Sequence, residues 1–65
     1  MINLYSVKPG ERARLKDGRE GLVLENMGDG QWLEVRFPDE PDAEPELVHS
    51  EDLIEVIPAE ENEAG

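Results

Sequence analysis

His49 is the only histidine in this chain of 65 residues, and Ser50 and Asp52 follow it closely. Histidine, serine and aspartate are the residue types of a nucleophilic triad. Adjacent residues of an extended strand point to opposite faces, however, so we do not expect His49 and Ser50 to share a proton. The sequence instead predicts His49 at a strand end and Ser50 as the cap of a helical turn, and it predicts no enzymatic activity.

A second group of reactive side chains lies in residues 38–45, which contain three prolines and four carboxylates. Their spacing lacks the glycine and the terminal bidentate glutamate of a calcium-binding loop. The chain has no cysteine that could serve as a soft metal ligand. Residues 28–30 contain two glycines but lack the lysine and the helix of a phosphate-binding loop. We therefore expect weak cation association in residues 38–45, and neither a metal site nor a cofactor.

The most distinctive candidate for binding is Trp32, which begins a segment of alternating character. Residues 32–37 place two sets of side chains on opposite faces of a strand: Leu33, Val35 and Phe37 on one, and Trp32, Glu34 and Arg36 on the other. An exposed tryptophan is a typical anchor of a binding surface. Strong bending of a small sheet can also bury both faces, so core packing and binding both remain open for Trp32.

The net charge of −11 belongs entirely to the second half of the chain. Residues 1–36 contain six acidic and six basic residues, whereas residues 37–65 contain eleven acidic residues and no lysine or arginine. This acidity either keeps a small protein soluble or offers a surface to a basic partner. Under the second interpretation the acids that would guide the partner lie in the loop of residues 39–46 and in the segment of residues 51–55.

The positive charges cluster around one predicted hairpin, at Arg12, Arg14, Lys16 and Arg19. They could bind an anion, or they could pair with the acidic loop of the same chain. We favour pairing, because Glu11, Glu20 and the acids of residues 39–46 are available. A strongly negative chain repels phosphate backbones and anionic lipid, so we expect neither direct nucleic-acid binding nor membrane binding.

Glycine and proline divide the chain into apolar runs of strand length, which predicts an all-β fold. We expect a tight hairpin turn at Asp17 and Gly18, a bend at Gly21 and one 3₁₀ turn over residues 50–53. A further, loosely held strand is expected near the N-terminus, with Ile2, Leu4 and Val7 packing inward. Residues 38–45 should form an exposed loop. The main predicted strands cover residues 12–15, 20–25, 32–37, 46–49 and 54–57.

Two parts of the chain resemble a known fold family. Residues 7–23 (VKPGERARLKDGREGLV) resemble the Tudor and KOW type of SH3-like barrel, in which a strand, a turn and a glycine-led strand follow in this order. Residues 32–37 (WLEVRF) and 47–56 (LVHSEDLIEV) are similar to the closing strands and 3₁₀ turn of small bacterial SH3-like proteins of unknown role. The resemblance covers residues 7–57 and implies a small five-stranded SH3-like barrel with a 3₁₀ turn before the last strand.

The functions of these families do not transfer with the resemblance. KOW domains that touch RNA generally present basic residues, and Tudor domains that read methyl-lysine build a cage from several aromatic side chains. This chain has only Tyr5, Trp32 and Phe37, and Phe37 is in phase with the predicted core.

We expect one domain over residues 1–57 and a disordered acidic tail over residues 58–65. The N-terminus does not have the pattern of a signal peptide, no apolar run has the length of a membrane span, and cysteine is absent. These features favour the cytoplasm.

The sequence thus predicts a non-enzymatic adaptor or regulatory module that binds a protein partner carrying a basic patch. An acidic mimic of nucleic acid, which inhibits a DNA- or RNA-binding protein, is the alternative. A homodimer formed by strand addition is also open, because a small β domain has free edges. The predicted binding residues are Trp32, Glu34, Arg36, Asp39, Glu40, Glu51, Asp52 and Glu55.

Overall fold

The computed structural model describes residues 3–40 and 42–59 of the chain. Five strands and two short 3₁₀ turns account for its regular structure: η1 (Leu4–Ser6), β1 (Arg12–Leu15), β2 (Glu20–Asn26), β3 (Trp32–Arg36), β4 (Glu46–His49), η2 (Ser50–Asp52) and β5 (Leu53–Ile57). The predicted all-β class, with five main strands and a 3₁₀ turn before the last, is confirmed.

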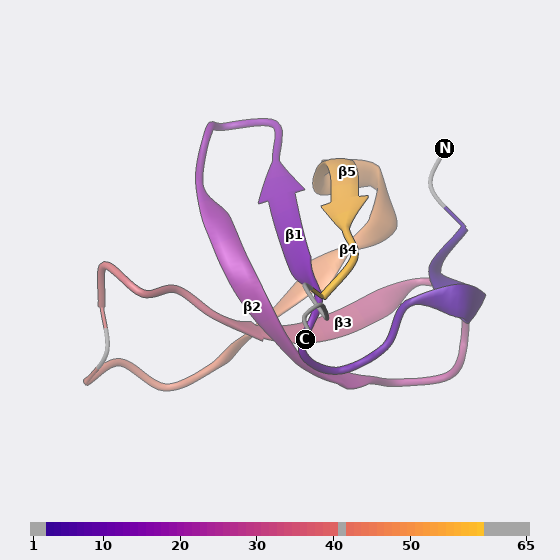
Figure 1. The fold of residues 1–65 in the computed structure, drawn as a ribbon, viewed down its shortest axis with the longest axis horizontal. Coiled ribbons are helices and arrows are strands. Elements are labelled where there is room, and N and C mark those ends of the chain that lie inside the picture. The colour runs from indigo at the N-terminus through magenta and orange to yellow at the C-terminus, as the bar shows by residue number, and fades with distance from the viewer. Residues whose placement is uncertain (1–2, 41, 60–65) are drawn as a thin grey trace.

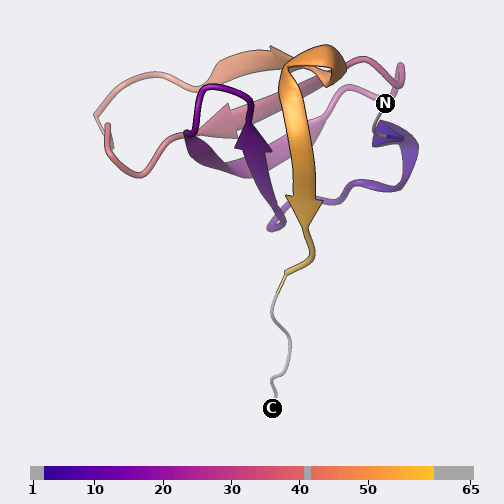
Figure 2. The ribbon, with the colours of Figure 1, turned by 90° about the horizontal axis from the view of Figure 1, so that it is seen from above.

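The five strands form one antiparallel sheet in the order β4-β3-β2-β1-β5. The long β2 strand runs through the middle of this sheet, and β3 and β4 cross the direction of β1 and β5 (Figures 1 and 2). The sheet is therefore strongly bent. The predicted closure into a barrel was wrong: β4 and β5 are the two ends of the sheet, and the described residues show no pairing between them.

The hairpin between β1 and β2 turns at Asp17 and Gly18, as predicted. Gly18 has a φ of 97°, a left-handed conformation that glycine adopts without steric cost. The Asp17 carboxylate accepts a hydrogen bond of 3.0 Å from the backbone N–H of Arg19, which fixes the turn. The register then sets Ala13 opposite Gly21 and Arg12 opposite Leu22.

The bend in β2 comes from two features rather than from Gly21 alone. The β2–β3 register passes from Val23 opposite Val35 to Glu25 opposite Glu34, so Leu24 is an extra residue. An extra residue on one strand of a pair is a β-bulge, which bends the strand and increases its twist. Gly21 contributes a close approach, since a Cβ atom there would lie 3.1 Å from the Phe37 ring.

The core lies inside this bend and is almost entirely aliphatic. Leu33, Val35 and Phe37 are all buried, so the predicted inward face of residues 32–37 is correct. Strand β3 itself ends at Arg36, one residue earlier than predicted. The full set of buried apolar side chains is Leu4, Val7, Ala13, Leu15, Val23, Leu33, Val35, Phe37, Val48 and Leu53.

The prediction of a strand near the N-terminus was wrong. Residues 4–6 form the 3₁₀ turn η1, and Asn3 is its N-cap: the Asn3 side chain accepts a hydrogen bond of 2.9 Å from the backbone N–H of Tyr5. Leu4 still packs in the core, as expected. The segment is attached by the Asn26 side-chain amide, which donates to the carbonyls of Leu4 at 2.6 Å and Val7 at 3.0 Å. Ile2 lies outside the described residues.

The 3₁₀ turn η2 is where expected, but its cap is not the predicted residue. His49 is the N-cap: its Nδ1 accepts a hydrogen bond of 3.1 Å from the backbone N–H of Glu51. Ser50 is buried and is the first residue of the turn.

The long loop and the C-terminal end are described only in part. The residues of the predicted loop 38–45 belong to no strand in the described part, and Pro38, Asp39 and Glu40 are exposed there. Residue 41 is outside the described residues. Strand β5 ends before Pro58, as expected. Residues 60–65 of the predicted tail also lie outside the described residues.

Candidate functional site

Trp32 and His49 form the centre of the candidate site, on the face of β3 and β4 that points away from the core. They are direct partners in the β3–β4 register. Their rings meet edge to face, with centroids 4.8 Å apart and an interplanar angle of 83°. Trp32 remains 37% exposed. Of the two interpretations left open by the sequence, full burial of Trp32 is therefore excluded, and its ring is available on the surface while being held on one side.

The turn before β3 fixes the backbone of Trp32. The Asp29 carboxylate accepts hydrogen bonds from the backbone N–H groups of Gln31 at 2.9 Å and Trp32 at 3.1 Å. These bonds stabilise the ionised form and so lower the pKa of Asp29 below its ordinary value of 3.8. The bond from Gln31 has the largest effect. The Tyr5 hydroxyl donates to the Asp29 carbonyl at 3.4 Å. The start of β3 is thus fixed by a charged turn.

The same outer face continues along β4 with an exposed aliphatic residue. Leu47 lies opposite Glu34 and is 58% exposed. We call the surface formed by Trp32, Glu34, Leu47 and His49 the Trp32 face. On its other side Glu34 lies opposite Glu25 of β2, so two acidic residues are direct partners across the strands. The Trp32 face therefore combines apolar side chains with negative charge and contains no lysine or arginine.

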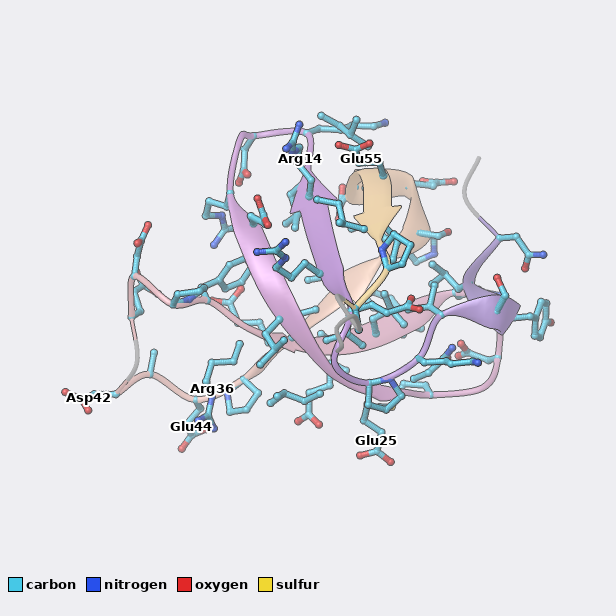
Figure 3. All side chains as sticks on the ribbon, viewed as in Figure 1. Arg14, Glu25, Arg36, Asp42, Glu44 and Glu55 are labelled. Atoms are coloured by element: carbon cyan, nitrogen blue, oxygen red, sulfur yellow. The ribbon has the colours of Figure 1, made fainter. Side chains whose placement is uncertain are left out.

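The structure divides the eight predicted binding residues among different regions. Trp32 and Glu34 lie on the Trp32 face, and Glu51 joins it through its N–H bond to His49. Arg36 ends β3 at the opposite end from Trp32, and Asp39 and Glu40 lie beyond it in the loop. Figure 3 shows Arg36 on the side of that loop with Asp42 and Glu44, away from Arg14 and Glu55.

The remaining two predicted residues, Glu55 and Asp52, lie beside the first hairpin, and Asp39 also approaches it. Glu55 of β5 forms an ion pair of 3.1 Å with Arg14. Asp52 accepts a hydrogen bond of 2.9 Å from the backbone N–H of Lys16 through its carbonyl. Asp39 lines an open hollow of about 710 Å³ together with Arg12 and Arg19. The predicted set is thus not one continuous binding surface.

Among the described residues, three of the four cations of the first hairpin are paired within the chain, but the predicted pairing with the acidic loop was wrong. Arg12 pairs with Glu20 at 3.3 Å, and Arg19 pairs with Asp17 at 2.9 Å while its guanidinium lies 4.4 Å from the centroid of the Phe37 ring. The third pair is the one between Arg14 and Glu55. In residues 3–40 and 42–59, no ion pair joins these arginines to the acids of the long loop. The partners are therefore the hairpin and β5.

The cluster of His49, Ser50 and Asp52 does not form a nucleophile and base. The Nδ1 of His49 is occupied by the backbone of Glu51, and Ser50 is 4% exposed. The part of the chain that the structure describes contains no group of three or more side chains able to hold a metal ion. It also contains no helix long and apolar enough to cross a membrane.

Sequence reasoning missed His49 and Leu47 as parts of the Trp32 face, and Asp29 as the acceptor that fixes the backbone of Trp32. The sequence could have indicated the role of Asp29, because an aspartate in a turn often accepts a hydrogen bond from the backbone N–H two residues further on. No pattern in the sequence indicates that His49 pairs with Trp32, because this pairing depends on the register between β3 and β4 across the long loop.

Comparison of the chain with protein-family models, with curated proteins and with solved structures gave no match.

Proposed function

We propose that this protein is a non-enzymatic binding module that recognises another protein through the Trp32 face. The observation that carries the proposal is the state of Trp32, which is 37% exposed while its backbone is fixed by Asp29 and its ring is held against His49. A tryptophan that is already ordered loses little conformational entropy on binding. Ordered aromatic side chains of this kind dominate the energetics of protein interfaces.

The neighbours of Trp32 indicate the chemistry of the partner. Leu47 adds exposed apolar surface, while Glu34, Glu25 and Glu51 add negative charge beside it. A partner that fits has an apolar pocket or ridge bordered by lysine or arginine. Because the acid-only half of the chain surrounds β4, the field steers a basic partner to this face and raises the association rate.

We also propose that the fold is of the SH3-like Tudor and KOW type and that the protein acts in the cytoplasm. The strand order β4-β3-β2-β1-β5 and the 3₁₀ turn before β5 support the resemblance found in residues 7–57. The occupied Nδ1 of His49 and the buried hydroxyl of Ser50 support a role without catalysis. The absence of cysteine supports a reducing compartment.

The test compares three forms of the protein as bait in native lysate: wild type, Trp32→Ala and Ile54→Ala. Ile54 is the matched control, since it is an exposed aliphatic residue of β5 outside the Trp32 face. Each captured protein is purified, and its binding is measured at low and high ionic strength. We expect Trp32→Ala to weaken binding by about tenfold or more, as for interface anchors, and Ile54→Ala to leave it unchanged. We expect the association rate to fall as salt rises.

A fourth variant distinguishes the mimic of nucleic acid from the adaptor. It replaces Asp39, Glu40, Asp42 and Glu44 by their amides. Loss of binding in this variant, with full binding by Trp32→Ala, would reject the Trp32 face and support mimicry. An association rate that does not respond to salt would assign the acidic residues to solubility alone.

A further inference from the structure

The two edges of the sheet differ in what lies beside them. Strands β4 and β5 end the sheet order on either side. The edge of β5 lies near the N-terminal segment, because Asn3, Ser6 and Val7 line the same hollow as Ile54 and Val56. By contrast, in residues 3–40 and 42–59 no strand pairs with the outer edge of β4, and Figure 2 shows β4 along the margin of the molecule.

The hydrogen bonds of the neighbouring residues establish which backbone groups of β4 point to this free edge. The N–H of Ser50 donates to the Gln31 carbonyl, and the Trp32 carbonyl accepts from Met27 on the β2 side. Bonding direction alternates along an antiparallel strand. It follows that Val48 bonds toward β3, whereas the N–H and C=O of Leu47 and the N–H of His49 point outward. The His49 carbonyl, as that of the N-cap residue, accepts the first hydrogen bond of η2.

The residues with outward backbone groups are also the residues of the Trp32 face. Leu47 and His49 direct their side chains to the surface that Trp32 shares. A strand added at this edge would bond to both backbones. Every second side chain of that strand would then lie beside Leu47 and His49, extending the Trp32 face by one strand.

The charge around β4 selects the occupant. Residues 37–65 contain no lysine or arginine, and Glu46 of β4 is exposed. Glu44 precedes the strand and Glu51 follows it. A second copy of the chain would bring its own charge of −11 and place acids against acids at this edge. A strand with lysine or arginine is complementary.

We infer that the free edge of β4 binds an extended segment of the partner, rich in lysine or arginine and in β-branched residues, as a sixth strand of the sheet. This inference rests on the proposed protein-binding function and adds the mode of recognition. Main-chain hydrogen bonds from Leu47 and His49 supply the pairing, and the alternate side chains of the segment contact the Trp32 face.

The first test uses two synthetic peptides of equal length and charge, one with alternating lysine and valine and one with alternating lysine and proline. Proline has no N–H to donate to a strand ladder, so only the valine peptide can complete the pairing. We expect the valine peptide to bind more tightly and to slow hydrogen exchange of the Leu47 and His49 amides in the unmodified protein. Equal binding, or unchanged exchange at these amides, would overturn the inference.

The second test separates the strand edge from the side-chain surface by comparing Leu47→Pro with Leu47→Ala. Both remove the leucine side chain, but only proline removes the outward N–H. Because that N–H does not bond to β3, the proline is compatible with an edge strand. We expect Leu47→Pro to bind the valine peptide about fivefold more weakly than Leu47→Ala, which corresponds to one backbone hydrogen bond.

Two further results would show that strand addition at β4 is wrong, and they would distinguish this from a failure of the Trp32 face. If the two Leu47 variants bind the peptide equally while Trp32→Ala still loses the captured partner, strand addition is wrong and the Trp32 face remains. If sedimentation shows a dimer without peptide, and Leu47→Pro abolishes it, the occupant is a second copy and the inference fails.

Discussion

At the residue scale, His49 connects the outer face to the closing turn. Its Nδ1 accepts from the backbone N–H of Glu51, and its ring supports Trp32. The two contributions to stability can be separated by mutation, because the hydrogen bond needs only an acceptor atom and the contact with Trp32 needs an aromatic ring. Histidine provides both.

We predict that His49→Ala lowers the free energy of unfolding by about 1 to 2 kcal/mol, the sum of a lost cap and a lost aromatic contact. His49→Asn restores an acceptor in the cap position without the ring, so it should recover about 0.5 to 1 kcal/mol of that loss. Urea unfolding of the three proteins at pH 7 measures both values. If the two variants are equally unstable, the hydrogen bond to Glu51 makes no contribution.

Asp29 and Asp17 link stability to acidity. Backbone N–H groups lower the pKa of both carboxyls below the ordinary value of 3.8, with Gln31 the main donor for Asp29 and Arg19 for Asp17. A pKa lowered in the folded state stabilises the fold above the ordinary value, and this contribution is lost as the pH falls through the folded pKa.

We therefore predict that the free energy of unfolding falls as the pH is lowered from about 4 toward 2. Asp29→Asn keeps a side-chain oxygen for Gln31 and Trp32 but cannot be protonated in this range, so its decline should be less steep. Glu51→Gln is the control: among the described residues Glu51 takes part in its turn through its backbone N–H and not through its carboxylate, so the change should leave the slope unchanged. A slope that is identical in Asp29→Asn would contradict the assignment.

At the scale of elements, β1 and β2 leave space for one aromatic ring. Gly21 lies opposite Ala13, and a Cβ at Gly21 would lie 3.1 Å from the ring of Phe37 and 3.3 Å from the Cβ of Val35. The Arg19 guanidinium contacts the same ring. Gly21 of β2 is thus required because the Phe37 ring, just after β3, occupies the space that a side chain would need.

We predict that Gly21→Ala destabilises the protein by about 1 to 3 kcal/mol, the usual cost of overpacking. Phe37→Leu provides space at this position, so the double variant should be more stable than the sum of the two single changes allows. A double-mutant cycle from urea unfolding gives this coupling. A coupling of zero would show that the added methyl group is accommodated without moving Phe37.

At the scale of the whole molecule, the two halves of the chain differ in how their charges affect the stability of the fold. The first half contains equal numbers of acidic and basic residues, and its Arg12, Arg14 and Arg19 form exposed ion pairs with Glu20, Glu55 and Asp17. Exposed pairs contribute little to stability. The second half contributes the whole excess of negative charge, and Glu25 opposite Glu34 adds a repulsive pair within the sheet.

We predict that the melting temperature rises as sodium chloride is increased from about 10 mM to 500 mM, because screening of the self-repulsion outweighs screening of the ion pairs. Glu25→Gln should raise stability at low salt by about 0.2 to 1 kcal/mol, and the gain should shrink as salt is added. Glu20→Gln, which removes the partner of Arg12, serves as the control and should give no such gain. A melting temperature that falls with salt would make the ion pairs dominant.

The sequence by itself determined the features that depend on neighbours along the chain. Alternation in residues 32–37 identified the buried side of β3, the Asp17 and Gly18 pair identified the hairpin, and residues 50–53 identified the 3₁₀ turn. Strand periodicity and turn conformations are local properties, so a few residues suffice to specify them.

The tertiary structure alone decided which residues meet. Trp32 lies against His49 because the register of β4 on β3 is set by packing of Val48 and Leu33 in the core, across a loop whose composition fixes no pairing. A second tertiary contact decides the form of residues 4–6. The Asn26 side chain donates a hydrogen bond to the carbonyl of Leu4, which lies in a 3₁₀ turn and not in a strand. Side-chain direction is a local property of a strand. The partner opposite each side chain depends on how the whole core closes.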